Sequence, residues 1–212
     1  MSLIPWVLGG ESATVETNPV NFQINGKAVL VREFDESQFG KDDKGREKPN
    51  ASYDVRVGPK CRDHRRQNPR DVNDTNPINI PPRTAATIVA FEEVQFPVSV
   101  IGLIVPKESL LQKGLSNWPT KVDPGYNGPL HITVYNHGNK SVRLRYGDPF
   151  CALLLFNVNP AAYPRTQKGA LLKGPNIGVS AERQVWTFVL GHWQWIVTTI
   201  IAVAALIKAL MK

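Results

Sequence analysis

The chain has 212 residues, a formal net charge of +7 and only two cysteines, Cys61 and Cys151. Two separated cysteines exclude a disulfide-stabilised scaffold, and the first residues lack the basic start and long apolar run of a secretory signal peptide. The positive charge favours an anionic partner, although a solvated basic surface would carry the same charge. Seventeen prolines and sixteen glycines favour an all-β body with many turns.

The first quarter of the chain alternates apolar runs with polar loops. Residues 3–8 predict a short helical turn. The Asn25-Gly26 dipeptide predicts a hairpin between two apolar runs, because Asn-Gly is the strongest short turn signal. Residues 36–50 are charged and broken by glycine, which is typical of a surface loop, and residues 52–58 alternate as a strand does.

A basic segment follows at residues 60–70, where five of eleven residues are Lys or Arg. Such a segment can contact phosphate, but it is more often a solvated loop, and it lacks the interleaved aromatic residues expected for single-stranded nucleic acid. Cys61 and His64 are spaced like half of a metal site, and no second half follows. We therefore expect neither a metal nor a nucleic acid here.

The middle of the chain predicts strands and one short helix. Residues 78–82 and 84–91 read as strands around a Pro-Pro turn, and residues 98–105 form a nearly continuous apolar run that predicts a buried strand. Residues 106–114 predict a short helix that ends at a glycine.

The clearest strand pattern lies in residues 121–156. Turn signals at 123–128, 137–139 and 147–149 separate three apolar runs, the first two with a period of two residues. This pattern predicts three successive antiparallel strands that form a meander.

The end of the chain differs in composition from the rest. Residues 159–183 are rich in Gly and Pro and predict a linker or arm. Residues 184–207 contain no Asp, Glu, Lys or Arg, and as a helix they would be about 36 Å long, enough to cross a hydrocarbon core. Tryptophans near the start and Lys208 and Lys212 at the end resemble interfacial anchors. We predict a C-terminal membrane helix over residues 184–212; the alternative is a helix that packs within an oligomer.

Four motifs in this order resemble those of the dCTP deaminase/dUTPase family. They are SYDVRVG, PKESLLQKGL, VDPGYNGPL and YGDPFCALLLF, similar to the family's [S/G]xDLRxG, GRSSLARxGL, xDPGYxG and xGDxIAQLxF, and FEEVQFP resembles the strand before the second motif. The resemblance implies that residues 1–158 form an all-β, dUTPase-like distorted barrel or jelly roll. It also implies a homotrimer with nucleotide sites between its subunits.

The resemblance makes the deaminase chemistry testable residue by residue. Deaminases of this family work without zinc, through a serine and an arginine of the second motif and a glutamate on the strand after the third. Glu108, Gln112 and Thr133 stand at these positions. A threonine hydroxyl cannot act as the general acid and base at neutral pH, and the HxE and PCxxC signature of zinc deaminases is absent. Deamination by the family mechanism is therefore not expected.

The residues that resemble a dUTPase site are better preserved. The resemblance implies that Asp123 would orient the attacking water, that Tyr126 would pack on the deoxynucleoside, and that Asp54 would support a Mg²⁺ ion from its second shell. Hydrolysis of dUTP or a related deoxynucleoside triphosphate, with Mg²⁺, is thus the alternative function. Nucleotide binding alone implies no cofactor.

The phosphate side of the same implied site departs from the family. Lys107, Ser109 and Gln112 would contact the nucleotide, together with the backbone at Gly125. A lysine is a point charge in place of a forked guanidinium, and Glu108 places a negative charge beside the phosphates.

Each of these residues also has a structural interpretation. Asp123 and Gly125 can serve the turn alone, the first by capping backbone N–H groups and the second by tolerating positive φ. Tyr126 can pack at a subunit boundary, and Asp54-Arg56 can form an inter-strand or intersubunit ion pair.

The sequence thus predicts a nucleotide-binding, catalytically degenerate relative of dCTP deaminases and dUTPases. Anchored by its tail to the cytoplasmic side of a membrane, it would act as a sensor or effector, for example in stress or antiphage signalling. The expected partners are a pyrimidine deoxynucleotide or similar ligand, two further copies of the chain and the membrane.

Overall fold

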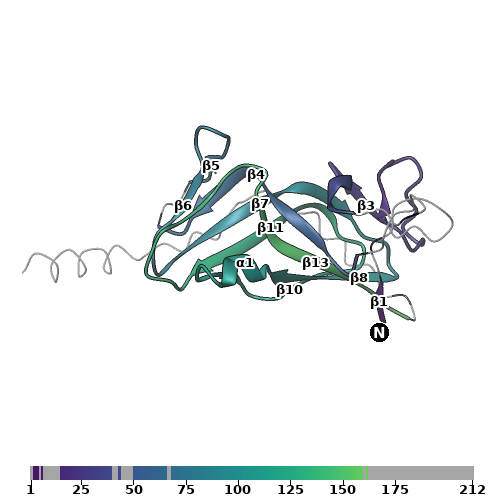
Figure 1. Ribbon diagram of the computed structural model, residues 1–212. Coiled ribbons are helices and arrows are strands. Elements are labelled where there is room, and N and C mark those ends of the chain that lie inside the picture. The colour runs from purple at the N-terminus through teal and green to yellow at the C-terminus, as the bar shows by residue number, and fades with distance from the viewer. Residues whose placement is uncertain are drawn as a thin grey trace, which may run out of the picture. The chain divides into compact units, whose positions relative to one another are not determined.

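The computed structural model describes residues 2–4, 6, 15–39, 43, 50–65, 68–159 and 161, and this part of the chain is built almost entirely of strands (Figure 1). The strands are β1 (Ser2–Ile4), β2 (Val15–Glu16), β3 (Val29–Arg32), β4 (Tyr53–Asp63), β5 (Arg70–Asp71), β6 (Ile78–Ile80), β7 (Thr84–Gln95), β8 (Val100–Pro106), β9 (Leu115–Asn117), β10 (Thr120–Val122), β11 (Asn127–Asn136), β12 (Val142–Leu144) and β13 (Pro149–Asn157). The helical elements are the 3-10 turn η1 (Glu36–Gln38) and α1 (Glu108–Leu111). The predicted all-β class is confirmed.

Most strands join one continuous hydrogen-bonded path, β10-β8-β13-β4-β7-β11-β9, and β12 pairs with β6 separately. The path turns within β4, whose first half pairs with β13 and whose second half pairs with β7. Gly58 lies at this change of partner, where a Cβ atom would sit 2.5 Å from the carbonyl oxygen of Ala90. Only glycine fits so close an approach, which explains the last residue of SYDVRVG.

The predicted meander is correct in its strands and wrong in their pairing. The three strands are β11, β12 and β13, but β11 pairs with β7 and β9, β12 pairs with β6, and β13 pairs with β1, β4 and β8. A period of two residues identifies a strand and its buried face, but it carries no information about which strand lies beside it.

Two predictions for the N-terminal part are also wrong. Residues 2–4 form a strand on the edge of β13 rather than a helical turn, and Trp6 follows fully buried, with its indole Nε1 donating to the carbonyl of Leu153 over 3.1 Å. The turn at Asn25-Gly26 exists but closes no hairpin, because β3 pairs in parallel with β2 and antiparallel with β7. Tertiary pairing has overridden the local turn signal.

The basic segment is only partly a loop, since its residues up to Asp63 belong to β4. No helix in the described part of the chain is long and apolar enough to cross a membrane. The predicted tail, residues 184–212, and nearly all of the predicted linker lie outside the described residues.

A buried carboxylate joins β4 to β7. Glu92 is 1% exposed, and its Oε1 accepts hydrogen bonds from the Tyr53 hydroxyl (2.9 Å) and from Arg56 Nε (2.7 Å). Its Oε2 accepts from the backbone N–H of Arg56 at 3.0 Å. The guanidinium of Arg56 also lies 4.5 Å from the Phe91 ring centre and 3.8 Å from the carboxylate of Asp35. Burial and the neighbouring Glu92 charge raise the pKa of Tyr53, which keeps its hydroxyl a donor.

We predict that Glu92→Gln lowers the free energy of unfolding by about 3 kcal/mol, because it leaves a largely buried guanidinium with only the more distant carboxylate of Asp35 as counterion. Urea denaturation measures this change. Glu93→Gln is a matched control in the next residue, since the Glu93–Arg32 pair (2.8 Å) is half exposed and contributes less than about 1 kcal/mol. Equal effects of the two substitutions would contradict the prediction.

Candidate functional site

The second-motif segment presents its polar residues to solvent. β8 ends at Pro106, Lys107 has extended backbone, and the single turn of α1 follows. Leu110 is buried and anchors this turn, whereas Glu108, Ser109 and Gln112 are exposed. The segment therefore displays one carboxylate, one hydroxyl and one amide at the end of a strand.

Lys107 reaches the first motif, because its Nζ forms an ion pair with Oδ2 of Asp54. The sheet register explains the contact, since Asp54 and Val105 both lie opposite Ala152 of β13. The Gln38 side chain fixes the Asp54 backbone, accepting from its N–H (2.7 Å) and donating to its carbonyl (2.8 Å).

Asp54 and Arg56 both form ion pairs between strands, as their structural interpretation expects. Within one copy of the chain they do not pair with each other; Asp54 pairs with Lys107, and Arg56 pairs with Glu92. The sequence could not predict this exchange of partners, because both contacts depend on strand pairing between distant segments.

The third motif forms a tight turn that places Asp123 beside Tyr126. The Tyr126 N–H donates to the carbonyl of Asp123 (3.1 Å), and Gly125 has a φ of +79°, which explains the glycine. The Asp123 carboxylate accepts from Lys121 Nζ at 2.7 Å, and among the described residues no backbone N–H donates to it. The turn thus uses the carbonyl of Asp123 and not its carboxylate, which argues against capping as the role of that side chain.

Tyr126 is half-buried against the core. Its hydroxyl donates to the carbonyl of Pro129 at 2.5 Å, and its own carbonyl accepts from the N–H of Phe96 at 2.8 Å. Burial raises the pKa of Tyr126 and keeps the phenol neutral. One ring is therefore held in a fixed orientation next to the Asp123 carboxylate.

At the position of the family glutamate, Thr133 belongs to a chain of neutral polar groups. Its Oγ1 lies 2.9 Å from Oγ1 of Thr87, directly opposite on β7, and the Thr87 hydroxyl lies 3.0 Å from Nε2 of His64. Partial burial and the nearby Arg62 lower the pKa of His64, which favours the neutral imidazole. The site prediction missed Thr87 and His64, since only the β4–β7–β11 register brings them to Thr133.

One copy of the chain does not bring the predicted nucleotide-binding residues together. Val122 lies opposite Gly102, so the Asp123–Tyr126 turn is beside the start of β8, whereas Lys107 follows its last residue. Six residues of β8 therefore separate the Asp123–Tyr126 turn from Lys107, which corresponds to about 20 Å along the strand. Asp123 and Tyr126 form one polar group, and Lys107, Ser109 and Gln112 form another.

The described residues contain no cluster of three or more His, Cys, Asp or Glu side chains that could hold a metal ion. Asp54 offers a single carboxylate, already neutralised by Lys107, and these residues do not fit a Mg²⁺ ion as they stand. Cys61 and Cys151 are both buried free thiols, and burial raises the pKa of each.

The described strands, with the four motifs on their turns and strand ends, define an all-β domain. A family model described as dCTP deaminase-like matches residues 21–158. The chain therefore belongs to the dCTP deaminase-like family, as its motifs predict.

Relatives that are at least 30% identical agree with this assignment. The dCTP deaminase of Thermococcus kodakarensis is 32% identical over 139 residues, covering 65% of this chain and 83% of that protein. The dCTP deaminase of Pyrococcus furiosus is 32% identical, with 65% and 82% covered. The Agrobacterium tumefaciens 2'-deoxycytidine 5'-triphosphate deaminase structure has a TM-score of 0.45 at 16% identity, with 57% of this chain and 43% of that chain covered. For the EIAV dUTPase structure the TM-score is 0.43 at 17% identity, with 68% and 99% covered.

We predict a favourable coupling energy of about 0.5–1 kcal/mol between Asp54 and Lys107, typical of a partly exposed ion pair. A double-mutant cycle of Asp54→Asn and Lys107→Gln, followed by urea denaturation, measures it. The cycle of Glu108→Gln with Lys107→Gln is the control, because Glu108 is exposed and forms no ion pair with Lys107. A coupling near zero for Asp54 and Lys107 would contradict the prediction.

Proposed function

We propose that the protein binds a pyrimidine deoxynucleotide in a site assembled between copies of its β domain, and that it does not deaminate this ligand. The observation that carries the proposal is the environment of Thr133. A hydroxyl bonded to Thr87, and through it to His64, stands where the family mechanism requires a carboxylate. The replacements at Glu108 and Gln112 support the same conclusion.

The separation of the two polar groups supports an intersubunit site. Asp123 and Tyr126 lie about 20 Å from Lys107 in one copy, farther than a single nucleotide's contacts are expected to span. A second copy that brings its α1 segment to the Asp123–Tyr126 turn would complete the site. A homotrimer with three such sites is the assembly that the family resemblance favours.

The two sides of this proposed site would contribute unequally to the affinity for the nucleotide. On one side, Tyr126 offers a rigid aromatic face and Asp123 a carboxylate that the turn itself does not use. On the other side, Lys107 is already paired with Asp54, and the exposed Glu108 repels phosphate. We therefore expect the nucleoside part to supply most of the affinity.

We further propose that residues 184–212 anchor the protein to the cytoplasmic side of a membrane. The basis is their sequence, which has no charged residue from 184 to 207. A nucleotide-binding domain on an anchor suits a sensor or effector that reports deoxynucleotide levels, as in stress or antiphage signalling.

The second candidate function is Mg²⁺-dependent hydrolysis of a deoxynucleoside triphosphate. The Asp123 carboxylate favours it, since this side chain caps no backbone N–H of the turn and, beside its exposed partner Lys121, could orient a water molecule. The pairing of Asp54 with Lys107 argues against it.

We expect calorimetric titration of the full-length chain in detergent to show binding of dCTP or dUTP. Tyr126→Ala should weaken this binding about tenfold, because it removes the aromatic face. Product analysis of the same samples, with and without Mg²⁺, should find neither deaminated nucleotide nor pyrophosphate. Failure to bind either nucleotide would overturn the proposal.

The same experiment separates the two functions. Pyrophosphate that is released by the native chain and not by Asp123→Asn would assign the hydrolase function. Formation of dUTP from dCTP would show that the site deaminates despite Thr133.

We predict that the full-length chain sediments with membranes and resists extraction by high salt and alkaline carbonate. A chain of residues 1–183 should appear in the soluble fraction, since it lacks the apolar segment. Recovery of the full-length chain from the soluble fraction would contradict the anchor and favour a tail that packs within the oligomer.

A further inference from the structure

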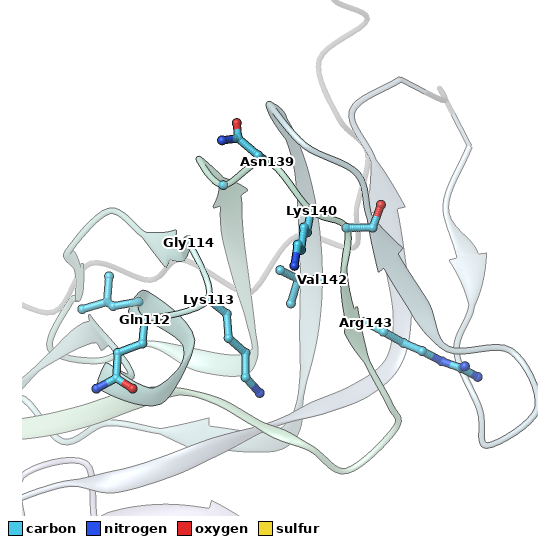
Figure 2. A pocket seen from close by; sticks show the side chains of 10 residues that line it. Gln112, Lys113, Gly114, Asn139, Lys140, Val142 and Arg143 are labelled. Atoms are coloured by element: carbon cyan, nitrogen blue, oxygen red, sulfur yellow. The ribbon is translucent and has the colours of Figure 1, made fainter.

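A second polar hollow lies away from the residues proposed to bind the nucleoside. It has a volume of about 660 Å³ and opens between the C-terminal end of α1 and the β11–β12 turn (Figure 2). Its polar side chains come from Gln112, Lys113, Asn139, Lys140, Ser141 and Arg143, and we call it the basic groove. Gln112 is the only residue that it shares with the proposed nucleotide site.

Backbone contacts hold the two sides of the basic groove together. The His137 N–H donates to the carbonyl of Gly114 at 2.8 Å. A Cβ atom on Gly114 would lie 2.8 Å from the Cα of Gly138, and Gly114 has a φ of +81°. The end of α1 and the β11–β12 turn can therefore approach this closely only because both positions are glycine.

A buried asparagine fixes the turn that carries Lys140. Asn136 is 1% exposed, and its Nδ2 donates to the carbonyls of Ile80 and Lys140, each at 2.8 Å. Its Oδ1 accepts from the N–H of Gly138 at 2.9 Å. Because every polar atom of this amide is used, the turn keeps one conformation, and a ligand would not have to order it.

The charges of the basic groove have one sign. Lys113 reaches it from the α1 side and Lys140 from the turn, whereas the Arg143 side chain on β12 extends away from both lysines (Figure 2). Among the described residues no Asp or Glu lines the basic groove, and neither lysine forms an ion pair with any carboxylate that the structure describes. Cations held together without counterions create a positive potential that attracts an anion.

Several other basic residues of the described chain do have partners. Lys107 and Lys121 are each paired with an aspartate, and Arg32 and Arg56 with a glutamate. Arg70, in the basic segment, donates instead to Asn76 and to the carbonyl of Pro77. The cations of the basic groove thus lie at one hollow and take part in none of these contacts.

We propose that the basic groove binds a small molecule that carries a chain of two or three phosphates. Its volume falls in the range of small-molecule sites, about 300–1,000 Å³. Among the described residues, only Leu111 and Val142 add larger apolar side chains to its lining, so an apolar ligand is disfavoured. Lys113 and Lys140, together with amide and hydroxyl groups, match several adjacent anionic oxygens, as a phosphate chain presents them.

The test is calorimetric titration of the full-length chain with inorganic tripolyphosphate, pyrophosphate and orthophosphate at constant ionic strength. We expect affinity to fall in that order, because fewer oxygens meet the two lysines. The double substitution Lys113→Gln/Lys140→Gln should weaken tripolyphosphate binding at least about tenfold. Lys60→Gln, an exposed lysine on β4, is the control for a positive charge removed outside the basic groove and should change binding less than about twofold.

Three results would overturn the proposal. They are no binding of any phosphate, an equal loss in Lys60→Gln, and tighter binding of a single-stranded oligonucleotide that the double substitution abolishes. The substituted side chains are exposed, so unchanged thermal unfolding serves as the check on folding.

The proposed nucleotide site is tested separately in the same variants. If the double variant keeps its affinity for dCTP or dUTP while losing tripolyphosphate, the two sites are independent. If Tyr126→Ala weakens tripolyphosphate as much as it weakens the nucleotide, the phosphates bind at the first site and the basic groove is not a second one.

Discussion

The buried carboxylate of Glu92 is the contact on which the arrangement of the strands depends. Taking a charge out of water costs several kcal/mol, and here the hydrogen bonds of Tyr53 and Arg56 offset that cost. Because all three donors come from β4, they hold the first half of this strand, which pairs with β13, in a fixed position against β7. Gly58 then lets β4 approach β7 closely and change partners. The register of β4 and β8 on β13 in turn places Asp54 where Lys107 can reach it.

This arrangement explains why one copy carries two incomplete halves of a site. β8 joins the Asp123–Tyr126 turn at its start to Lys107 at its end, and a strand cannot bend enough to bring its own ends together. Chemistry that needs both halves must use a second copy. The chemistry is also limited: Thr133 bonds to the Thr87 hydroxyl where the family mechanism requires a carboxylate, and the cation of Lys107 is already paired with Asp54.

The basic residues that stand out in the sequence are not the ones that line the basic groove. The basic segment is conspicuous in the sequence, yet its first residues belong to β4 and Arg70 binds neighbouring polar groups. Lys113 and Lys140 are far less conspicuous, and they lie at one hollow because Gly114 and Gly138 meet there. A high local density of charge along the chain is thus a poor guide to where an anion would bind.

The sequence by itself determined the all-β class, the positions of most strands and the tight turn at Asp123–Tyr126. These features are local, since alternation, glycine and proline act through neighbouring residues. It also determined the family, through the spacing of its motifs. Only the tertiary structure decided the partners of β11, β12 and β13, the pairing of Asp54 with Lys107, the polar chain from Thr133 to His64 and the basic groove. Each of these depends on the register between segments far apart in the chain, and no pattern within a single segment specifies that register.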